Sequence, residues 1–180
     1  DNNNQYLLDD NWVDFEVIKQ TFKVKLFGPF YIKYPLDMFF SKHGPVLKDD
    51  SRAFALRYVG MDDVDHSTSW LRLNKASNFS EWKSALEMQQ LASLNLIYAD
   101  KDDNIFFVHN VKSPIRNADY DWTKVIPGDK SELIWNDFHP FDTIPQILNP
   151  QSGYLFSTNQ NPFYVTAPEE NLVMEDFTDT

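Results

Sequence analysis

Alternation of apolar and polar residues dominates the first third of the chain. Residues 21–26 place Phe22, Val24 and Leu26 on one side and a threonine and two lysines on the other, which predicts a half-buried strand. Further strands are predicted at 6–8, 12–13, 15–17, 30–32 and 53–59. Because Asp, Asn, Gly and Pro separate these runs, the pattern predicts an antiparallel meander.

Only one segment shows clear helical spacing. Asn78 is a suitable N-cap, and Glu81 three residues later completes the pattern of a capping box. The apolar residues at helical spacing are Phe79, Trp82 and Leu86. These features predict one main helix over about 78–95.

A second hairpin is predicted in the stretch 95–109, where two apolar strands flank the polar residues 101–104. His109 ends this hairpin and is interpreted as a hydrogen-bonded structural histidine. His43 precedes a Gly-Pro pair that predicts a tight turn, with Gly44 at positive φ. Since nothing nearby supplies the serine and aspartate of a catalytic triad, His43 is also interpreted as structural.

Residues 60–68, GMDDVDHST, combine three aspartates with His66. Their spacing fits no EF-hand loop, because a turn glycine and a closing glutamate are both missing. We therefore predict a solvated acidic loop. The following long stretch, 111–148, is predicted to be mostly irregular, and such a region is usually functional or wraps another subunit.

Residues 149–162, NPQSGYLFSTNQNP, predict a turn, a short buried strand at Tyr154–Phe156 and an amide-rich tip closed by Pro162. A buried strand that ends in carboxamides can hold a neutral NH₂ group at a fixed point. An oxyanion hole needs such a donor. The alternative interpretation is that Asn159, within this tip, is only a turn residue.

The 180 residues carry a net charge of −11, which argues against nucleic acid and against anionic membrane surfaces as partners. Hydrophobic residues make up 42% of the chain, enough for a core, and the aromatic share of 16% favours sheets and lined pockets. The absence of cysteine excludes disulfides and a thiol nucleophile within the chain. No apolar run is long enough to cross a bilayer.

Three stretches resemble the penicillin amidase family, which comprises penicillin acylases and acyl-homoserine-lactone acylases. The resembling stretches are the NP-x-x-G turn and Asn before Pro within 149–162, the YAD and NI residues of 98–105, and the helix start at Asn78. The resemblance runs from about Tyr6 to Pro162. It implies that 1–165 is the middle part of an acylase catalytic β subunit, whereas 166–180 is predicted to be an acidic, frayed tail.

The family belongs to the N-terminal-nucleophile hydrolases. The resemblance therefore implies an α+β fold of two stacked antiparallel sheets with flanking helices, of which this chain holds a part. Family precursors are zymogens that cleave themselves to release a serine, whose own amine then acts as the base. Since this chain begins at Asp1, past that serine, we expect the isolated chain to be inactive.

Site residues follow from the same resemblance. Asn159 matches the side-chain donor of the oxyanion hole. Trp70 and Leu94 match walls of the acyl pocket, with plain core packing as their alternative. No cofactor or metal is predicted, although some members bind a structural calcium, whose ligands lie mostly upstream while Glu170 is only roughly in position.

The implied substrate is a small acyl-amide, such as a penicillin, an acyl-homoserine lactone or an acylated peptide. The corresponding biological roles are antibiotic metabolism and quorum quenching. The implied partners are the α chain and the rest of the β chain of the same precursor, and exposed sheet edges allow the fragment to form a homodimer. The family implies a periplasmic or extracellular location, although no signal segment is present in this chain.

Two other hypotheses stay open from the sequence. The chain could be a non-catalytic, β-rich binding module that recognises a sugar or peptide. Its aromatic face would comprise Trp12, Trp70, Trp122 and Trp135. Alternatively, the chain descends from an acylase and serves as a scaffold without catalysis.

Overall fold

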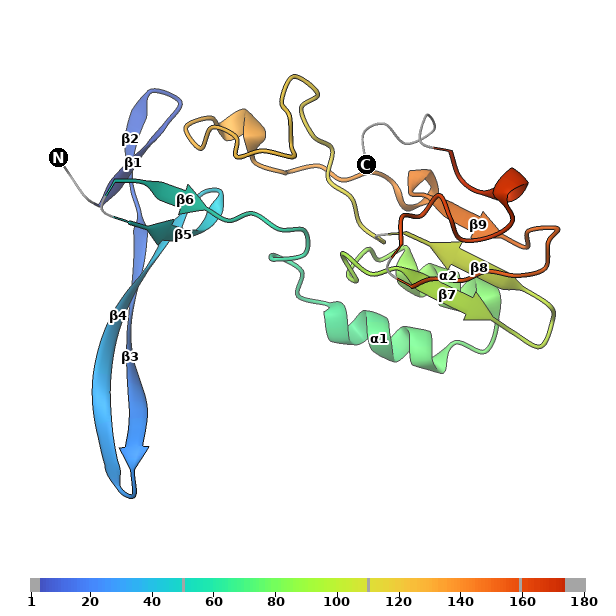
Figure 1. Ribbon diagram of the computed structural model, residues 1–180, viewed down its shortest axis with the longest axis horizontal. Coiled ribbons are helices and arrows are strands. Elements are labelled where there is room, and N and C mark those ends of the chain that lie inside the picture. The colour runs from blue at the N-terminus through green and yellow to red at the C-terminus, as the bar shows by residue number, and fades with distance from the viewer. Residues whose placement is uncertain (1–3, 50, 110, 159, 174–180) are drawn as a thin grey trace. The chain divides into compact units, whose positions relative to one another are not determined.

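The computed structural model describes residues 4–49, 51–109, 111–158 and 160–173. The chain forms two compact units (Figure 1). The first unit comprises Asp1–Tyr58 and Asn117–Ile134, and the second comprises Val59–Arg116 and Trp135–Thr180. In the described ranges, all strand pairs of both units are antiparallel.

The first unit is the predicted meander. Its elements are β1 (Gln5–Leu8), β2 (Asn11–Asp14), β3 (Glu16–Phe27), β4 (Phe30–Ser41), β5 (Gly44–Lys48), β6 (Ala53–Ala55) and the 3₁₀ turn η1 (Ser131–Leu133). Strands β1 and β2 pair by themselves, and β3 to β6 form a four-stranded sheet in chain order. The β1–β2 turn uses Asp9 and Asp10, both at positive φ, which is the backbone geometry of a tight two-residue hairpin.

Strands β3 and β4 form a long two-stranded ribbon, paired from Glu16↔Phe40 to Phe27↔Phe30. Gly28, at φ +51°, makes the turn between them. The alternation predicted for residues 21–26 is correct, but the expected burial is wrong. Phe22, Val24 and Leu26 are all exposed, because β5 pairs with β4 only at Phe39–Ser41 and no described element covers the ribbon at residues 22–26.

Strands β5 and β6 complete this sheet. Gly44 has φ +133°, which confirms the tight turn predicted after His43. Strand β6 ends at Ala55, earlier than the predicted residue 59. One further backbone hydrogen bond, from the N–H of Leu56 to the carbonyl oxygen of Pro45, follows the last paired residues of β5 and β6.

The second unit contains two helices, where the sequence predicts one. Its elements are α1 (His66–Lys75), α2 (Phe79–Leu86), β7 (Leu96–Ala99), β8 (Ile105–Val108), β9 (Gln146–Leu148) and the 3₁₀ turns η2 (Phe141–Thr143) and η3 (Pro168–Glu170). Helix α1 begins inside the segment that we predicted to be a loop. Only two of its residues, Ser69 and Leu73, are buried, so it has no wide apolar stripe to reveal it.

Helix α2 starts as predicted and ends early. The side chain of Asn78 accepts a hydrogen bond from the backbone N–H of Glu81 at 2.9 Å, which confirms the cap. The predicted end at residue 95 is wrong, because the helix stops at Leu86. The chain leaves the helix through Gln89, which has φ +50° and donates from its side chain to the carbonyl oxygen of His139.

The core of the second unit lies between the helices and one face of the β7–β8–β9 sheet. Its buried members are Leu73, Ala85, Leu86, Leu91, Phe106, Val108, Val111, Phe141 and Ile144. Phe79 and Trp82 of α2 pack their rings against Tyr98 and Phe106 of the sheet, with centroids 4.8–6.1 Å apart. Burial of large aromatic and aliphatic side chains is the main source of stability here.

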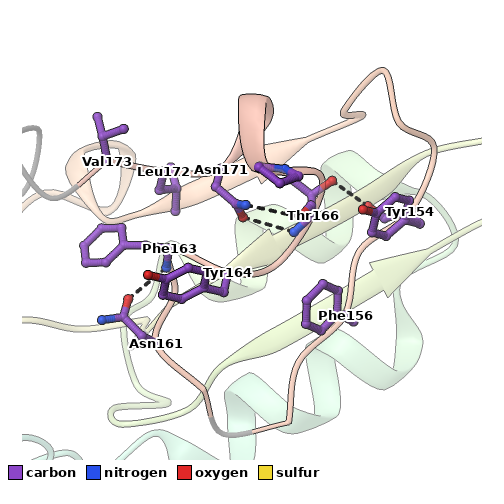
Figure 2. Close-up of a pocket in the computed structure, with 10 residues that line it drawn as sticks. Tyr154, Phe156, Asn161, Phe163, Tyr164, Thr166, Asn171, Leu172 and Val173 are labelled. Atoms are coloured by element: carbon purple, nitrogen blue, oxygen red, sulfur yellow. Dashed lines mark hydrogen bonds between the residues drawn. The ribbon is translucent and has the colours of Figure 1, made fainter.

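The C-terminal segment covers the other face of this sheet. Figure 2 shows the segment in front of the strands and the helices behind them. Val165, Thr166 and Ala167 are buried, and Asn171 accepts from the N–H groups of Val165 and Thr166 at 2.7 and 3.1 Å. The structure thus describes an ordered start of the predicted tail, and residues 174–180 lie outside the described residues.

Within the described ranges, neither helix is long and apolar enough to cross a membrane.

Candidate functional site

The two stretches with the most specific motifs, 98–105 and 149–162, meet at a pair of asparagines. Asn149 donates from Nδ2 to Oδ1 of Asn104 at 3.2 Å, and its own Oδ1 accepts the backbone N–H of Ile105 at 2.8 Å. The backbone N–H of Asn149 completes the junction by bonding to the carbonyl oxygen of Ile105. The turn of the β7–β8 hairpin therefore anchors the start of the amide-rich segment.

Asp100 organises that hairpin turn. Its carboxylate accepts the hydroxyl of Tyr98 at 2.9 Å, the backbone N–H groups of Asp102 and Asn104, and the side-chain amide of Asn104. These hydrogen bonds to the charged form, led by the side chain of Asn104, lower the pKa of Asp100 from 3.8 to about 2. Asn104 is thus held by Asp100 on one side and by Asn149 on the other.

Beyond Asn149 the chain makes the predicted tight turn. Gly153 has φ +75° and donates its N–H to the carbonyl oxygen of Pro150. Glu170, at the end of η3, accepts the backbone N–H groups of Gln151 and Ser152. A carboxylate on the C-terminal segment therefore closes the turn.

The prediction of a short buried strand at Tyr154–Phe156 is wrong. The segment belongs to no strand, and Tyr154 and Phe156 are 47% and 42% exposed. Its backbone lies beside the C-terminal segment, with the N–H of Phe156 bonded to the carbonyl oxygen of Val165. Both rings line a surface hollow together with Phe163 and Tyr164.

The loop after Phe156 is held by a carboxamide. Gln160 donates from Nε2 to the carbonyl oxygens of Phe156 and Tyr164, at 3.1 and 2.9 Å, and its Oε1 accepts from both the N–H and the hydroxyl of Thr158. Asn161 accepts the backbone N–H of Phe163 at 2.9 Å. The predicted oxyanion donor, Asn159, lies outside the described residues.

An aromatic hollow of about 660 Å³ opens next to this loop. Its lining residues are Tyr154, Phe156, Asn161, Phe163, Tyr164, Thr166, Pro168, Asn171, Leu172 and Val173. Figure 2 shows that the polar members are engaged with their own chain, since Asn171 and Thr166 bond each other and Thr166 bonds the backbone at Tyr154. The wall offered to an occupant is therefore mainly apolar.

The predicted acyl-pocket residues occupy different settings. Trp70 lies on α1, partly exposed, with its ring 6.4 Å from that of His66. Leu94 follows α2 and packs against the core of the second unit. Neither residue lines the aromatic hollow beside the amide-rich loop, so their roles remain predictions.

Of the two histidines, His43 is buried and His109 is partly buried. His43 is bonded to the backbone of Gly128, and burial together with the nearby charge of Arg57 lowers the pKa of its imidazole. Burial also lowers the pKa of His109, whose backbone N–H is bonded to Pro145. In both side chains, burial disfavours the charged imidazolium form.

The solvated acidic loop predicted at 60–68 needs correction. Asp63 is buried, with 8% of its side chain exposed, and forms an ion pair with Lys112, which is 12% exposed. The ammonium group of Lys112 also lies 4.3 Å from the ring centroid of Phe138. A sequence pattern cannot reveal this pair, because its partners lie 49 residues apart.

In the described ranges, no three His, Asp or Glu side chains come together as a metal site.

The four tryptophans of the predicted binding face divide between the units, with Trp12 and Trp122 in the first and Trp70 and Trp135 in the second.

Comparisons with known proteins agree with the motifs. The penicillin amidase family model matches residues 1–179. Penicillin G acylase of Escherichia coli is 33% identical over 124 residues, which cover 67% of this chain and 14% of that protein. Penicillin acylase 2 proenzyme of Pseudomonas sp. (strain SE83) is 28% identical over 127 residues, covering 68% of this chain and 16% of the relative.

A solved structure extends the likeness to the fold. A thermostable penicillin G acylase from Alcaligenes faecalis superposes with a TM-score of 0.73 at 26% identity, covering 94% of this chain and 31% of that chain. The predicted class, α+β with antiparallel sheets of the N-terminal-nucleophile hydrolase type, is thereby confirmed. The matched residues span only 14–16% of the length of these curated relatives. By its sequence and its fold, this chain belongs to the penicillin amidase family of hydrolases.

Proposed function

We propose that this chain is part of the catalytic subunit of an acylase that hydrolyses an amide between an apolar acyl group and an amine. The observation that carries the proposal is its membership of the penicillin amidase family, whose relatives named above are acylases. The substrate class is a penicillin, an acyl-homoserine lactone or an acylated peptide. The protein acts in the periplasm or outside the cell.

In this proposal the nucleophile is a serine that self-cleavage releases at a new N-terminus, upstream of Asp1. Its free α-amine, with a pKa of about 8, takes the hydroxyl proton as the serine attacks the amide carbonyl. The same amine then donates a proton to the departing amine. The isolated chain lacks this serine and is inactive.

Asn159 donates its side-chain NH₂ to the oxygen that becomes negative in the tetrahedral intermediate. Two features support this assignment. The carboxamide of the next residue, Gln160, is occupied at both ends inside the loop, so it braces the backbone on either side of position 159. The junction of Asn149 with the β7–β8 hairpin fixes the start of the same segment.

The test compares Asn159→Ala with Asn161→Ala in the longer, processed protein, using an apolar acyl anilide whose aniline product absorbs light. Loss of the donor is expected to lower kcat about 10²- to 10³-fold, equal to about 2.7–4 kcal/mol. KM should change by less than about threefold, since the donor acts mainly in the transition state. The Asn161 variant should keep most of its kcat.

A loss of kcat in the Asn161 variant alone would show that Asn159 is not the donor. Full activity in both variants would remove the oxyanion role from this loop. Intact mass and N-terminal sequencing of the same preparation test self-cleavage separately, because two pieces, the second starting with serine, are expected.

A further inference from the structure

A groove runs between the two helices of the second unit. Helices α1 and α2 follow each other in the chain, separated only by residues 76–78, and they pack together. The groove has a volume of about 520 Å³. Its lining positions are 68, 71, 72 and 75 on α1 and 80, 81, 84 and 85 on α2, so each helix contributes one of its faces. This space is called the α1–α2 groove below.

Two cationic side chains line the α1 side of the groove. Arg72 and Lys75 lie in the last turn of α1, and both are exposed. Within the described ranges neither side chain forms an ion pair, although the chain contains 27 acidic residues and only 16 basic ones. A guanidinium group can bind both oxygens of one carboxylate, and a neighbouring ammonium group adds another charged donor. The pair can therefore receive a carboxylate.

The groove also offers apolar surface beside these cations. Leu71 lies one residue before Arg72 and is 53% exposed. Ala76 is half-buried and Ala85 is buried, and both line the same groove. A short alkyl chain or an aromatic ring in the groove would remove this apolar surface from water, which favours binding.

The groove contains one acidic side chain, and its carboxylate is already hydrogen-bonded. Glu81 accepts the backbone N–H and the hydroxyl of Ser77 at 2.9 and 2.8 Å. These donors partly compensate its negative charge. The other polar residues that α2 contributes are Ser80 and Ser84, whose hydroxyls form no hydrogen bond among the residues that the structure describes. An occupant would therefore meet two cations and neutral hydroxyl groups.

We propose that the α1–α2 groove binds a small amphipathic carboxylate, with its anionic group at Arg72 and Lys75 and its apolar part against Leu71. The site is separate from the amide-rich loop, because none of the described residues of 149–173 lines it. The inference does not depend on the proposed reaction. The competing explanation is that the two cations only complement the negative end of the α1 dipole, in which case the groove stays filled with water.

Photo-crosslinking locates the ligand directly and needs no turnover. The probe is 4-benzoylbenzoate, an aromatic carboxylate, and 4-benzoylbenzyl alcohol is its uncharged counterpart. Each is irradiated with the longer protein, and peptide mass mapping gives the labelling of residues 68–85 as a function of probe concentration. The double variant Arg72→Gln with Lys75→Gln is compared with Lys101→Gln, which removes a positive charge from an exposed turn of the same unit. Glutamine is a good helix former, so α1 should be retained, and circular dichroism checks this.

The carboxylate probe is expected to label residues 68–85 with saturation, whereas the alcohol should not. The concentration for half-maximal labelling should rise at least about tenfold in the double variant, because charge-assisted hydrogen bonds are lost, and should not change in Lys101→Gln. Octanoate should compete with the probe. Absence of saturable labelling in the folded protein, or an unchanged concentration in the double variant, would overturn the proposal. Competition by inorganic phosphate as strong as that by octanoate would also overturn it, because the apolar part of the ligand would then contribute nothing.

Discussion

Asn149 and Asn104 are 45 residues apart in the chain and are joined side chain to side chain, with Nδ2 of Asn149 3.2 Å from Oδ1 of Asn104. Asn104 is also bonded to the Asp100 carboxylate. Asn149 bonds the backbone of Ile105 in addition. The hairpin turn and the amide-rich segment are therefore one connected hydrogen-bonded structure, and a change at Asn149 should be felt by both.

The first prediction concerns Asn149. Asn149→Ala removes two side-chain hydrogen bonds and places alanine at φ +49°, so the free energy of unfolding should fall by about 1–3 kcal/mol. Asn149→Asp keeps the acceptor for Ile105 and tolerates this backbone, so it should cost less. Urea unfolding of the three proteins measures the difference. Equal stability of the alanine and aspartate variants would contradict the role assigned to the bond with Ile105.

The second prediction is a pH dependence at Asp100. Because its pKa is lowered from 3.8 to about 2 in the folded protein, Asp100 stabilises the fold above about pH 4, and this contribution is lost as the pH falls towards 2. The stability difference between wild type and Asp100→Asn should therefore shrink across that range. Tyr98→Phe removes one donor to the carboxylate and should raise the pKa of Asp100 in an NMR titration. An unchanged difference between pH 5 and pH 2 would speak against this linkage.

The third prediction compares a buried with an exposed ion pair. Replacing either partner of the Asp63–Lys112 pair leaves the other charge buried and unpaired, so each single change should lower the free energy of unfolding by about 3–5 kcal/mol. The double variant Asp63→Asn with Lys112→Met should lose less than the sum of the two single changes. Lys101→Ala, which breaks the exposed pair with Asp102, should cost less than about 1 kcal/mol. A double-mutant cycle by chemical unfolding checks this, and additive single effects would exclude the coupling.

The fourth prediction concerns two glycines. Gly60 has φ +90°, and a Cβ there would lie 2.9 Å from Cβ of Ala92, so Gly60→Ala combines strain with a clash. Gly28 has φ +51° with open space around it, so Gly28→Ala carries the backbone strain of about 1–2 kcal/mol alone. Thermal unfolding should therefore show the larger loss for Gly60→Ala. Equal losses would mean that the loop at Gly60 shifts freely.

The sequence predicts those parts of the fold that depend on neighbouring residues. The turn between the strands predicted at 6–8 and 12–13, the positive φ of Gly44 and the cap at Asn78 are all set within a few residues, and all are confirmed. The family resemblance, on motifs of similarly short range, was correct as well. Of the site residues, Asn159, Trp70 and Leu94 stay predictions.

Features that depend on distant parts of the chain could not be inferred. Helix α1 buries only Ser69 and Leu73, so its pattern resembles that of a polar loop. Helix α2 ends at Leu86, shortly before Gln89, whose side chain bonds the distant His139. The exposure of Tyr154 and Phe156 depends on the C-terminal segment, because the backbone of Phe156 is bonded to Val165 and both rings line the hollow beside it.

Local sequence thus determined the turns, the caps and the alternation of the strands, because a residue's backbone preferences and its near neighbours decide them. Tertiary structure alone decided the burial of Asp63 with Lys112 and the junction of Asn104 with Asn149. Burial and long-range pairing are properties of surfaces that meet only after folding, and the spacing of residues along a chain does not encode which surfaces will meet.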